Sequence, residues 1–161
     1  MNDAVRAYNQ AVRFLSPRAR STMETRNNLK KKGFDPKIID ETLAKLTQEG
    51  ILNDTEFAAL FVESRERFRP RSRFAIGYEL RQKGVDKAII ESALADVDDE
   101  DAALRAVKSK LDRWRNLDDS DLKKKVMGLL RNRGFSHGVS ISTYSIILND
   151  RKNTEVLPDE N

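Results

Sequence analysis

The chain consists of segments in which apolar residues recur every three or four positions, separated by short polar segments. The first segment has Ala4, Tyr8, Ala11, Val12 and Leu15 on one side of a helix that Ser16 and the proline after it terminate or kink. This spacing predicts an amphipathic helix in residues 1–15.

Two longer segments have the same period. Residues 54–68 predict a helix that Asp54 caps after the stop signal at Gly50, with an apolar face at Phe57, Leu60, Phe61 and Ser64. Residues 99–114 predict a second helix of this kind, with Ala103, Val107, Lys110, Leu111 and Trp114 along one side.

Three stretches of the chain resemble one another closely. Gly33, Gly84 and Gly134 recur at steps of 51 and 50 residues, and the apolar positions around them coincide. A period of this size predicts stacked helical units, so we expect an all-α fold: an elongated, curved array of three tandem three-helix repeats. The stretches are "NLKKKGFDPKIIDETL" (28–43), "ELRQKGVDKAIIESAL" (79–94) and "LLRNRGFSHGVSISTY" (129–144).

The repeat also predicts boundaries. We expect repeats in residues 16–68, 69–116 and 117–148 after the helix in residues 1–15, and a disordered tail in residues 149–161. The segment "VSISTYSII" (139–147) alternates like a strand, but its position in the repeat favours a helix.

Each repeat contains a corner between two helices. A helix ends at the glycine, which tolerates the left-handed backbone conformation, and a basic residue in the last turn suits the helix dipole. The next helix begins at once, with Asp35, Asp86 or Ser136 at its N-cap and Pro36 in a first-turn position.

Composition narrows the class of protein. Charged residues make up 35% of the chain and hydrophobic ones 39%, the net charge is +4, and there is no cysteine. The excess of basic residues lies in the first 75 residues, which favours a polyanionic partner there. We expect a cytoplasmic protein without disulfides, because the chain has neither a signal peptide nor an apolar run long enough to cross a membrane.

The segment "SRERFRPRSRF" (64–74) contains five arginines, and "RPRS" within it repeats "RARS" of residues 18–21. Arginines just before a helix start oppose the helix dipole, so we interpret both clusters as an edge that binds phosphates or acidic groups. Phe68 and Phe74 are candidates for stacking on bases. The alternative is a solvated helix face with Glu63 and Glu66 as neighbours.

The candidate residues of this basic edge are basic side chains from all three repeats. The arginines of residues 64–74 rank first, Arg18 and Arg20 second, and the lysine clusters, which are better explained as solvated surface, last. The full set is Arg65, Arg67, Arg69, Arg71, Arg73, Arg18, Arg20, Lys30, Lys31, Lys32, Lys123, Lys124, Lys125, Arg131 and Arg133.

The residues give no sign of catalysis. The single histidine, His137, lies at a predicted helix start, and no Gly-rich phosphate loop, nucleophile motif or metal-ligand spacing is present. The acidic clusters at residues 96–101 and 118–121 are explained as linkers and N-caps. We therefore expect no enzymatic activity, no cofactor and no metal.

Three parts of the chain resemble the RecX family of bacterial recombination regulators. They are the segment from "RARSTMETRNNLKKKGF" to "GILNDTEFAALFVESR", then "IGYELRQKGVDKAIIESAL", and then "LLRNRGF". The resemblance covers about residues 15–148. It implies a protein without catalytic residues that binds the RecA recombinase, lies in the groove of the RecA filament on DNA, and restrains filament growth, ATP hydrolysis and strand exchange. We expect a monomer that contacts single- or double-stranded DNA weakly or through RecA.

Two alternatives stay open from the residues. One is a nucleic-acid-binding protein whose helical units contact DNA directly. The other is a helical scaffold that docks an unrelated protein.

Overall fold

The computed structural model describes residues 2–155, and the regular structure in that part of the chain is entirely helical, which confirms the predicted all-α fold. The segment that alternates like a strand lies within the last helix, as its position in the repeat predicts. The elements are α1 (Asp3–Leu15), α2 (Thr22–Lys31), α3 (Pro36–Gln48), α4 (Asp54–Phe68), α5 (Arg73–Gln82), α6 (Lys87–Ala93), α7 (Asp99–Lys108), a 3-10 turn η1 (Leu111–Trp114), α8 (Asp119–Asn132) and α9 (His137–Glu155).

Polar side chains cap these helices at the predicted positions. Asp35 accepts a hydrogen bond of 2.9 Å from the first turn of α3, and Ser136 accepts one of 3.1 Å from the first turn of α9. The acidic clusters supply Asp98 and Asp118, which cap α7 and α8 with bonds of 2.9 and 2.8 Å. Asp86 has the extended backbone of a cap but makes no such side-chain bond.

The start of α4 differs from the prediction. Asn53, rather than Asp54, accepts the capping hydrogen bond, at 3.1 Å from the backbone of Glu56. Asp54 instead accepts bonds of 2.8 and 3.1 Å from the backbone and hydroxyl of Thr22. The predicted apolar face is also rotated, because Leu60 is 46% exposed. The buried side of α4 consists of Phe57, Ala58 and Val62.

The three glycine corners form as predicted. Gly33, Gly84 and Gly134 have φ angles of 85°, 77° and 84°. At each corner the backbone N–H after the glycine bonds back to a carbonyl five residues earlier, as Phe135 does to Leu130 at 3.0 Å. This pattern closes the last turn of the helix and is the reason that the repeat requires a glycine there.

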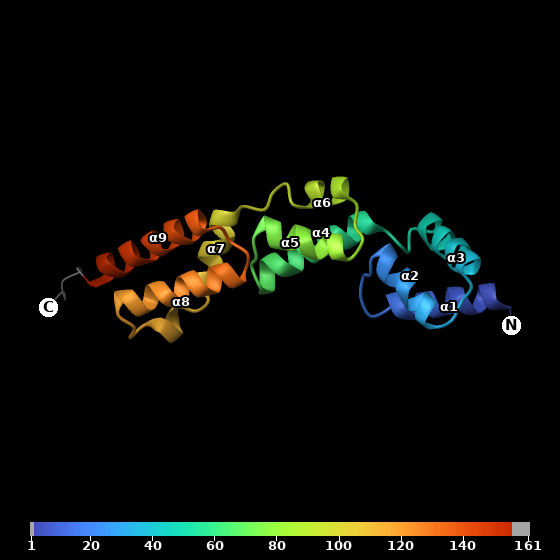
Figure 1. Ribbon diagram of the computed structural model, residues 1–161, viewed down its shortest axis with the longest axis horizontal. Helices are drawn as coiled ribbons and strands as arrows, with labels where there is room; N and C mark the ends of the chain where they lie inside the picture. The colour runs from blue at the N-terminus through green and yellow to red at the C-terminus, as the bar shows by residue number, and fades with distance from the viewer. Residues whose placement is uncertain (1, 156–161) are drawn as a thin grey trace. The chain divides into compact units, whose positions relative to one another are not determined.

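The chain forms two compact units. One contains the residues up to Ser64 together with Gly77–Ala95, and the other contains Arg65–Ile76 together with the residues from Asp96 onward. In the first unit α1, α2 and α3 pack against one another, and in the second α7, α8 and α9 do so (Figure 1).

Because of this packing, the first and last bundles begin one helix earlier than the predicted repeat boundaries. The helix of residues 1–15 was expected to stand apart, but Ala7 and Ala11 on its inner face are fully buried. Its Tyr8 donates a hydrogen bond of 2.5 Å to Glu49 after α3. The opening helix is therefore the first helix of the first bundle, and α7, predicted to close a repeat, packs with α8 and α9 and begins the last one.

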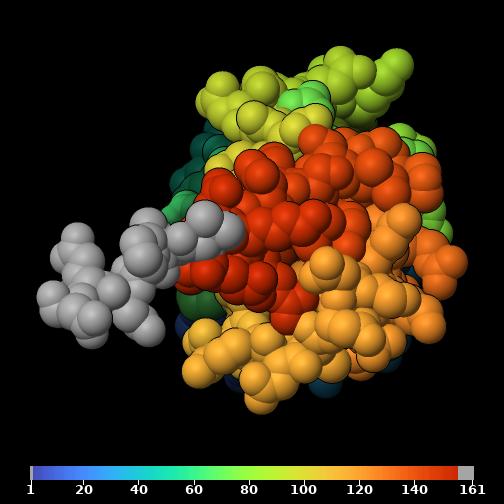
Figure 2. Space-filling model, turned by 90° about the vertical axis from the view of Figure 1, so that its left-hand side faces the viewer, coloured from blue at the N-terminus to red at the C-terminus, as the bar shows by residue number. Residues whose placement is uncertain are grey.

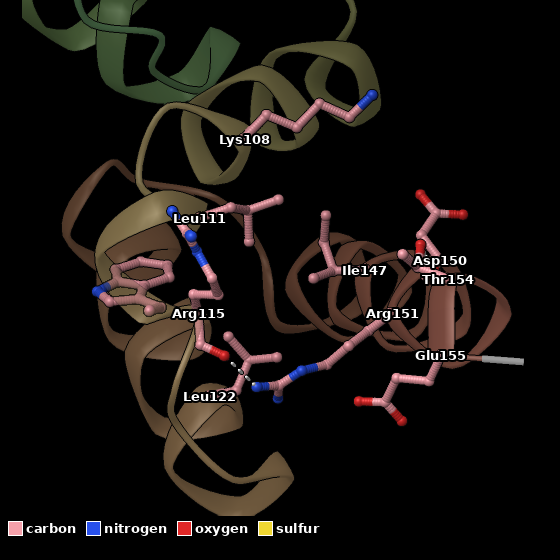
Figure 3. A pocket seen from close by; sticks show the side chains of 10 residues that line it. Lys108, Leu111, Arg115, Leu122, Ile147, Asp150, Arg151, Thr154 and Glu155 are labelled. Carbon is pink, nitrogen blue, oxygen red and sulfur yellow. Dashed lines mark hydrogen bonds between the residues drawn. The ribbon is translucent and has the colours of Figure 1, made fainter. Parts of the chain in front are cut away.

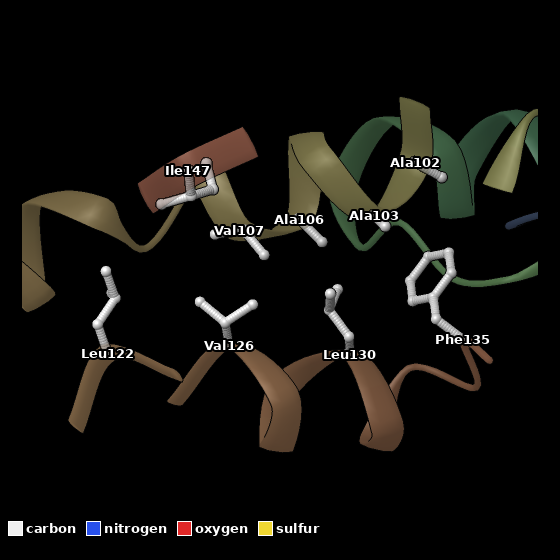
Figure 4. Close-up of a cluster of buried hydrophobic side chains, with 9 residues drawn as sticks. All are labelled: Ala102, Ala103, Ala106, Val107, Leu122, Val126, Leu130, Phe135 and Ile147. Atoms are coloured by element: carbon white, nitrogen blue, oxygen red, sulfur yellow. The ribbon is translucent and has the colours of Figure 1, made fainter. Parts of the chain in front are cut away.

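Each bundle has its own apolar core. In the second unit the small side chains of α7 face larger ones of α8, so the two helices approach closely (Figure 4). Helices α8 and α9 lie side by side at the surface in Figure 2. The core of the first bundle consists of Ala11, Leu29, Ile39, Leu43, Leu46 and Leu52, and that of the last consists of Ala102, Ala103, Ala106, Val107, Leu122, Val126, Leu130, Phe135 and Ile147.

Two helix ends also differ from the prediction. The helix expected in residues 99–114 stops at Lys108, where the hydroxyl of Ser109 donates to the carbonyl of Ala106 at 2.7 Å, and the turn η1 follows. Helix α9 continues to Glu155, so the tail predicted to be disordered from residue 149 is helical up to that point. Arg151 explains this extension, because its guanidinium bonds backbone carbonyls before α8. Residues 156–161 of the predicted tail lie outside the described residues.

Candidate functional site

The start of α2 meets the end of α5 in the first unit, at a contact that we call the first junction. The hydroxyl of Ser21 donates a hydrogen bond of 2.7 Å to the carbonyl of Lys83 and accepts one of 3.1 Å from the backbone of Glu24. The carboxylate of Glu24 accepts from the backbone N–H of Ser21 at 3.3 Å, which completes a capping box.

Glu24 is also the centre of the charges at this junction. Its carboxylate lies 3.4 Å from Arg18, 3.9 Å from Arg20 and 3.8 Å from Lys83. The guanidinium of Arg20 additionally lies over the ring of Phe14, 4.4 Å from its centre. The three cations of the first junction are therefore held by contacts within the protein.

The start of α5 meets the end of α8 in the second unit, at the second junction. Here the backbone N–H of Ser72 donates to the carbonyl of Arg133 at 3.1 Å, and the hydroxyl of Ser72 accepts from the backbone of Ala75 at 3.0 Å. The guanidinium of Arg133 donates to the carbonyl of Pro70 at 3.1 Å. This junction repeats the first, since Ser72 and Arg133 occupy the positions of Ser21 and Lys83.

Positive charges gather at the second junction. Burial lowers the pKa of Arg133, and the neighbouring charges of Arg69 and Arg71 lower it further. Arg69 is exposed and Arg71 is half-buried. The structure thus brings together three residues of the predicted basic edge, from the arginine segment and from the third glycine corner.

The starts of α2 and α5 do not present free N–H groups in the way that the sequence suggested. Asp54 accepts from the first backbone N–H of α2, and Asp99 accepts from that of Arg73 in α5, in both cases at 2.8 Å. Aspartates from α4 and α7 therefore occupy the place at which a bound anion was expected. The helix N-termini are structural, and the candidate site consists of side chains.

The other arginines of residues 64–74 have different surroundings. Arg65 is half-buried, whereas Arg67 is exposed and its guanidinium lies 5.5 Å from the ring centre of Phe68. Arg73 is exposed and donates to the carbonyl of Val97 at 3.0 Å. Arg73 therefore has a structural role, while Arg67 presents its charge to solvent.

One acidic residue of this segment is used internally. The side chain of Glu66 lies 3.3 Å from Arg105 of α7, and its backbone carbonyl accepts from the same guanidinium at 2.6 Å. Arg105 also bonds Asp101 at 2.8 Å. Arg105 thereby ties the end of α4 to α7.

The remaining predicted basic residues lie on exposed helix surfaces. Lys30–32 surround the end of α2, and Lys123–125 lie in the first half of α8. Arg131 and Lys124 line a shallow hollow of about 290 Å³ on α8 and the start of α9, which also includes His137. None of these lysines is drawn into either junction by a contact in the described part of the chain.

A larger cavity of about 360 Å³ lies in the second unit, between the turn η1, α8 and α9. Leu111, Leu122 and Ile147 form its apolar wall, and Arg151 crosses one side to bond the carbonyl of Arg115 at 3.0 Å (Figure 3). This contact explains how the last turns of α9 are held in place.

The contacts that distinguish the two junctions were not predicted from the sequence. The pairing of Glu24 with Lys83 is one of them, because the two residues lie far apart in the chain. A signal was present in the repeat, since Ala75 stands where Glu24 stands one repeat earlier. Asp54 and Asp99, which hold the two helix starts, had no recognisable signal beyond their helix-start positions.

Metal sites and membrane spans are both absent from residues 2–155. No group of three or more histidine, aspartate or glutamate side chains in that range is placed to hold a metal ion. No helix there has the length and apolar character that a membrane span needs.

Comparison with known proteins places the chain in a family. Models of the first, second and third three-helix domains of RecX match residues 7–46, 53–94 and 98–140. These ranges follow the observed phase of the bundles, because each begins with the helix that the sequence analysis had placed at the end of a repeat or outside it.

Individual relatives agree with this assignment. "Regulatory protein RecX" of Mycobacterium sp. (strain JLS) is 34% identical over 91% of this chain and 84% of its own length, and that of Chlorobium phaeobacteroides (strain BS1) is 37% identical over 85% and 91%. The crystal structure of RecX from Lactobacillus salivarius has the same fold, with a TM-score of 0.74 at 23% identity over 89% of this chain and 95% of that one. The chain therefore belongs to the RecX family of regulatory proteins.

Proposed function

We propose that this protein binds the filament that the RecA recombinase forms on DNA, and that it restrains filament growth, ATP hydrolysis and strand exchange. Membership of the RecX family, with all three domains matched, is the observation that carries this proposal. The curated relatives bear the name of a regulatory protein rather than that of an enzyme, which supports action by binding alone.

The cationic surface at the second junction supports a role for the basic edge in this binding. Arg67 and Arg69 are exposed, and the charge of Arg69 lies close enough to the half-buried Arg133 to lower its pKa. A RecA filament on DNA presents phosphates, to which arginine binds through charge-assisted and bidentate hydrogen bonds. We propose that the second junction faces the nucleoprotein filament, with the first and the lysine clusters contributing less.

We propose that the protein acts as a cytoplasmic monomer and that its tandem helical repeats bridge neighbouring RecA protomers. Such bridging would block extension of the filament without chemistry by the regulator itself. Electrostatic attraction speeds the encounter, and the helices provide the contact area.

The test is a RecA ATPase assay on single-stranded DNA with increasing amounts of the protein. We expect the ATPase rate to fall as the protein is added, and growth of the filament to slow in parallel. An unchanged rate at concentrations that saturate binding to RecA would favour a scaffold without regulatory action and would contradict the proposal.

A companion measurement separates this function from plain binding to DNA. Its readout is the affinity for RecA in the absence of DNA, compared with the affinity for bare DNA as a function of salt. Tight binding to DNA with a steep salt dependence and no affinity for RecA would favour the nucleic-acid-binding alternative.

A further inference from the structure

The two junctions consist of equivalent positions but differ in one charge. At the first junction Glu24 neutralises Arg18, Arg20 and Lys83 at distances between 3.4 and 3.9 Å. At the second junction the position of Glu24 is occupied by Ala75, which has no charge to offer. The second junction therefore has no carboxylate at the position from which Glu24 closes the first.

Two of the cations at the second junction have no carboxylate partner. Within residues 2–155, neither Arg69 nor Arg133 lies in an ion pair. The guanidinium of Arg133 donates to the carbonyl of Pro70, the residue after Arg69, at 3.1 Å, and the charge of Arg69 contributes to the lowered pKa of Arg133. Like charges held together in this way are relieved by a bound anion, so the site is complementary to a polyanion.

Exposed aromatic side chains flank this cluster. Phe68 is 78% exposed and Phe74 is 79% exposed, although both belong to residue types that are usually buried. Arg67 lies against the ring of Phe68, so cation and aromatic face form one surface. Cations that follow a phosphate backbone, combined with aromatic faces for the bases, are typical of sites for single-stranded nucleic acid.

We propose that the second junction binds single-stranded nucleic acid, with Arg69 and Arg133 on its phosphates and Phe68 and Phe74 stacked on its bases. Glu24 closes the equivalent site at the first junction. An acidic protein segment would satisfy the cations but not the two exposed aromatic rings. The assignment rests on the proposed function, because it names the part of the nucleoprotein filament that this site would contact.

The experiment measures binding of the full chain to a fluorescein-labelled oligothymidylate by anisotropy over a range of salt concentrations. Arg69→Gln removes one phosphate contact and leaves the backbone hydrogen bonds of the junction in place. We expect it to weaken binding roughly three- to tenfold and to make the log–log salt slope shallower by about 0.7. The control is Arg113→Gln, since Arg113 is an exposed arginine of η1 outside the junction.

A second pair of variants tests the role of the missing carboxylate. Ala75→Glu supplies the charge that Glu24 supplies at the first junction, and Ala75→Gln supplies the same bulk without the charge. We expect Ala75→Glu to weaken binding to the oligonucleotide at least as strongly as Arg69→Gln, and Ala75→Gln to weaken it much less. Circular dichroism checks that both variants fold.

Several results would overturn the assignment. They are undetectable binding of the wild type to the oligonucleotide, equal weakening by Arg69→Gln and Arg113→Gln, and equal weakening by Ala75→Glu and Ala75→Gln. Preferential binding of poly-glutamate over the oligonucleotide would assign the site to an acidic protein instead.

The RecA ATPase assay on the same proteins distinguishes this failure from failure of the proposed function. If the wild type inhibits RecA and the Arg69→Gln variant binds DNA normally, only the proposed nucleic-acid site is contradicted. If the wild type binds the oligonucleotide through Arg69 but does not affect RecA, only the proposed function is contradicted.

Discussion

The hydroxyl of Ser21 donates a hydrogen bond of 2.7 Å to the carbonyl of Lys83, which lies one repeat further along the chain. Ser72 makes the corresponding contact at the second junction through its backbone, with the carbonyl of Arg133. In both cases the cap of one helix closes the glycine-terminated end of another. The capping serine thus joins consecutive repeats as well as starting its own helix.

Replacement of Ser21 tests this double role. Ser21→Ala removes both the cap of α2 and the bond to Lys83, so we expect the free energy of unfolding to fall by about 1–2 kcal/mol. Urea denaturation measures the change. Ser145→Ala, on the exposed side of α9, is the control and should change stability by less than about 0.5 kcal/mol. Equal effects of the two changes would contradict the joining role of Ser21.

The three corner glycines should respond differently to alanine. At Gly33 a Cβ atom would meet no neighbour within 4 Å, whereas at Gly134 it would lie 2.7 Å from the Cβ of Ala75. At Gly84 it would lie 2.6 Å from the Cβ of Met23. The left-handed backbone costs about 1–2 kcal/mol at all three positions, and overpacking adds about 1–3 kcal/mol at the last two. Urea denaturation of the three variants checks this order, and a Gly33→Ala variant as unstable as Gly134→Ala would contradict it.

Release of the first junction should create a second anion site. Glu24→Gln preserves an amide that can serve in the capping box but removes the charge that holds Arg18, Arg20 and Lys83. We expect the variant to bind single-stranded oligonucleotide more tightly than the wild type and with a steeper salt dependence. Unchanged affinity and slope would show that Glu24 does not close this site.

The repeat explains why much of the fold was predictable. Each corner combines a glycine, a cap and an apolar residue at fixed spacing, so local chemistry determines where helices end and begin. Which helix begins each bundle was not predictable in the same way, because it depends on which helices pack together. The burial of Ala7 and Ala11 assigns α1 to the first bundle, and no local signal at Ser16 or Pro17 reveals this.

The candidate site was predictable only in part. The arginine segment pointed to Arg69 and Arg71, and the third corner to Arg133, but their proximity is a tertiary fact. Sequence reasoning also gave Arg73 the same role, although its guanidinium supports the carbonyl of Val97. An arginine that is available to bind a partner differs from one that hydrogen-bonds a backbone carbonyl of the protein itself. The residue spacing does not show where those carbonyls lie.

Charge repulsion at the second junction should appear in the stability of the protein. A lowered pKa means that folding disfavours the charged form of Arg133, and at neutral pH this cost is present because the group is charged in both states. Arg69→Gln removes part of the repulsion, so we expect the melting temperature to stay equal or rise slightly while binding to nucleic acid weakens. A lower melting temperature in differential scanning calorimetry would contradict this expectation.

The last turns of α9 should depend on one side chain. Arg151 bonds the backbone carbonyls of Arg115 and Leu117 and lies 3.4 Å from Asp119. Arg151→Gln removes these contacts, so we expect faster amide hydrogen exchange in residues 149–155 and little change in residues 137–145. Lys152→Gln is the matched control on the same helix. Unchanged exchange in the Arg151 variant would show that these contacts do not hold the end of α9.

The most direct test of the account is the concentration of protein that halves the RecA ATPase rate on single-stranded DNA, measured for wild type, Arg69→Gln and Arg113→Gln. The account predicts inhibition by the wild type, a severalfold higher concentration for Arg69→Gln, and an unchanged one for Arg113→Gln. Equal inhibition by all three proteins, or none by the wild type, would contradict it.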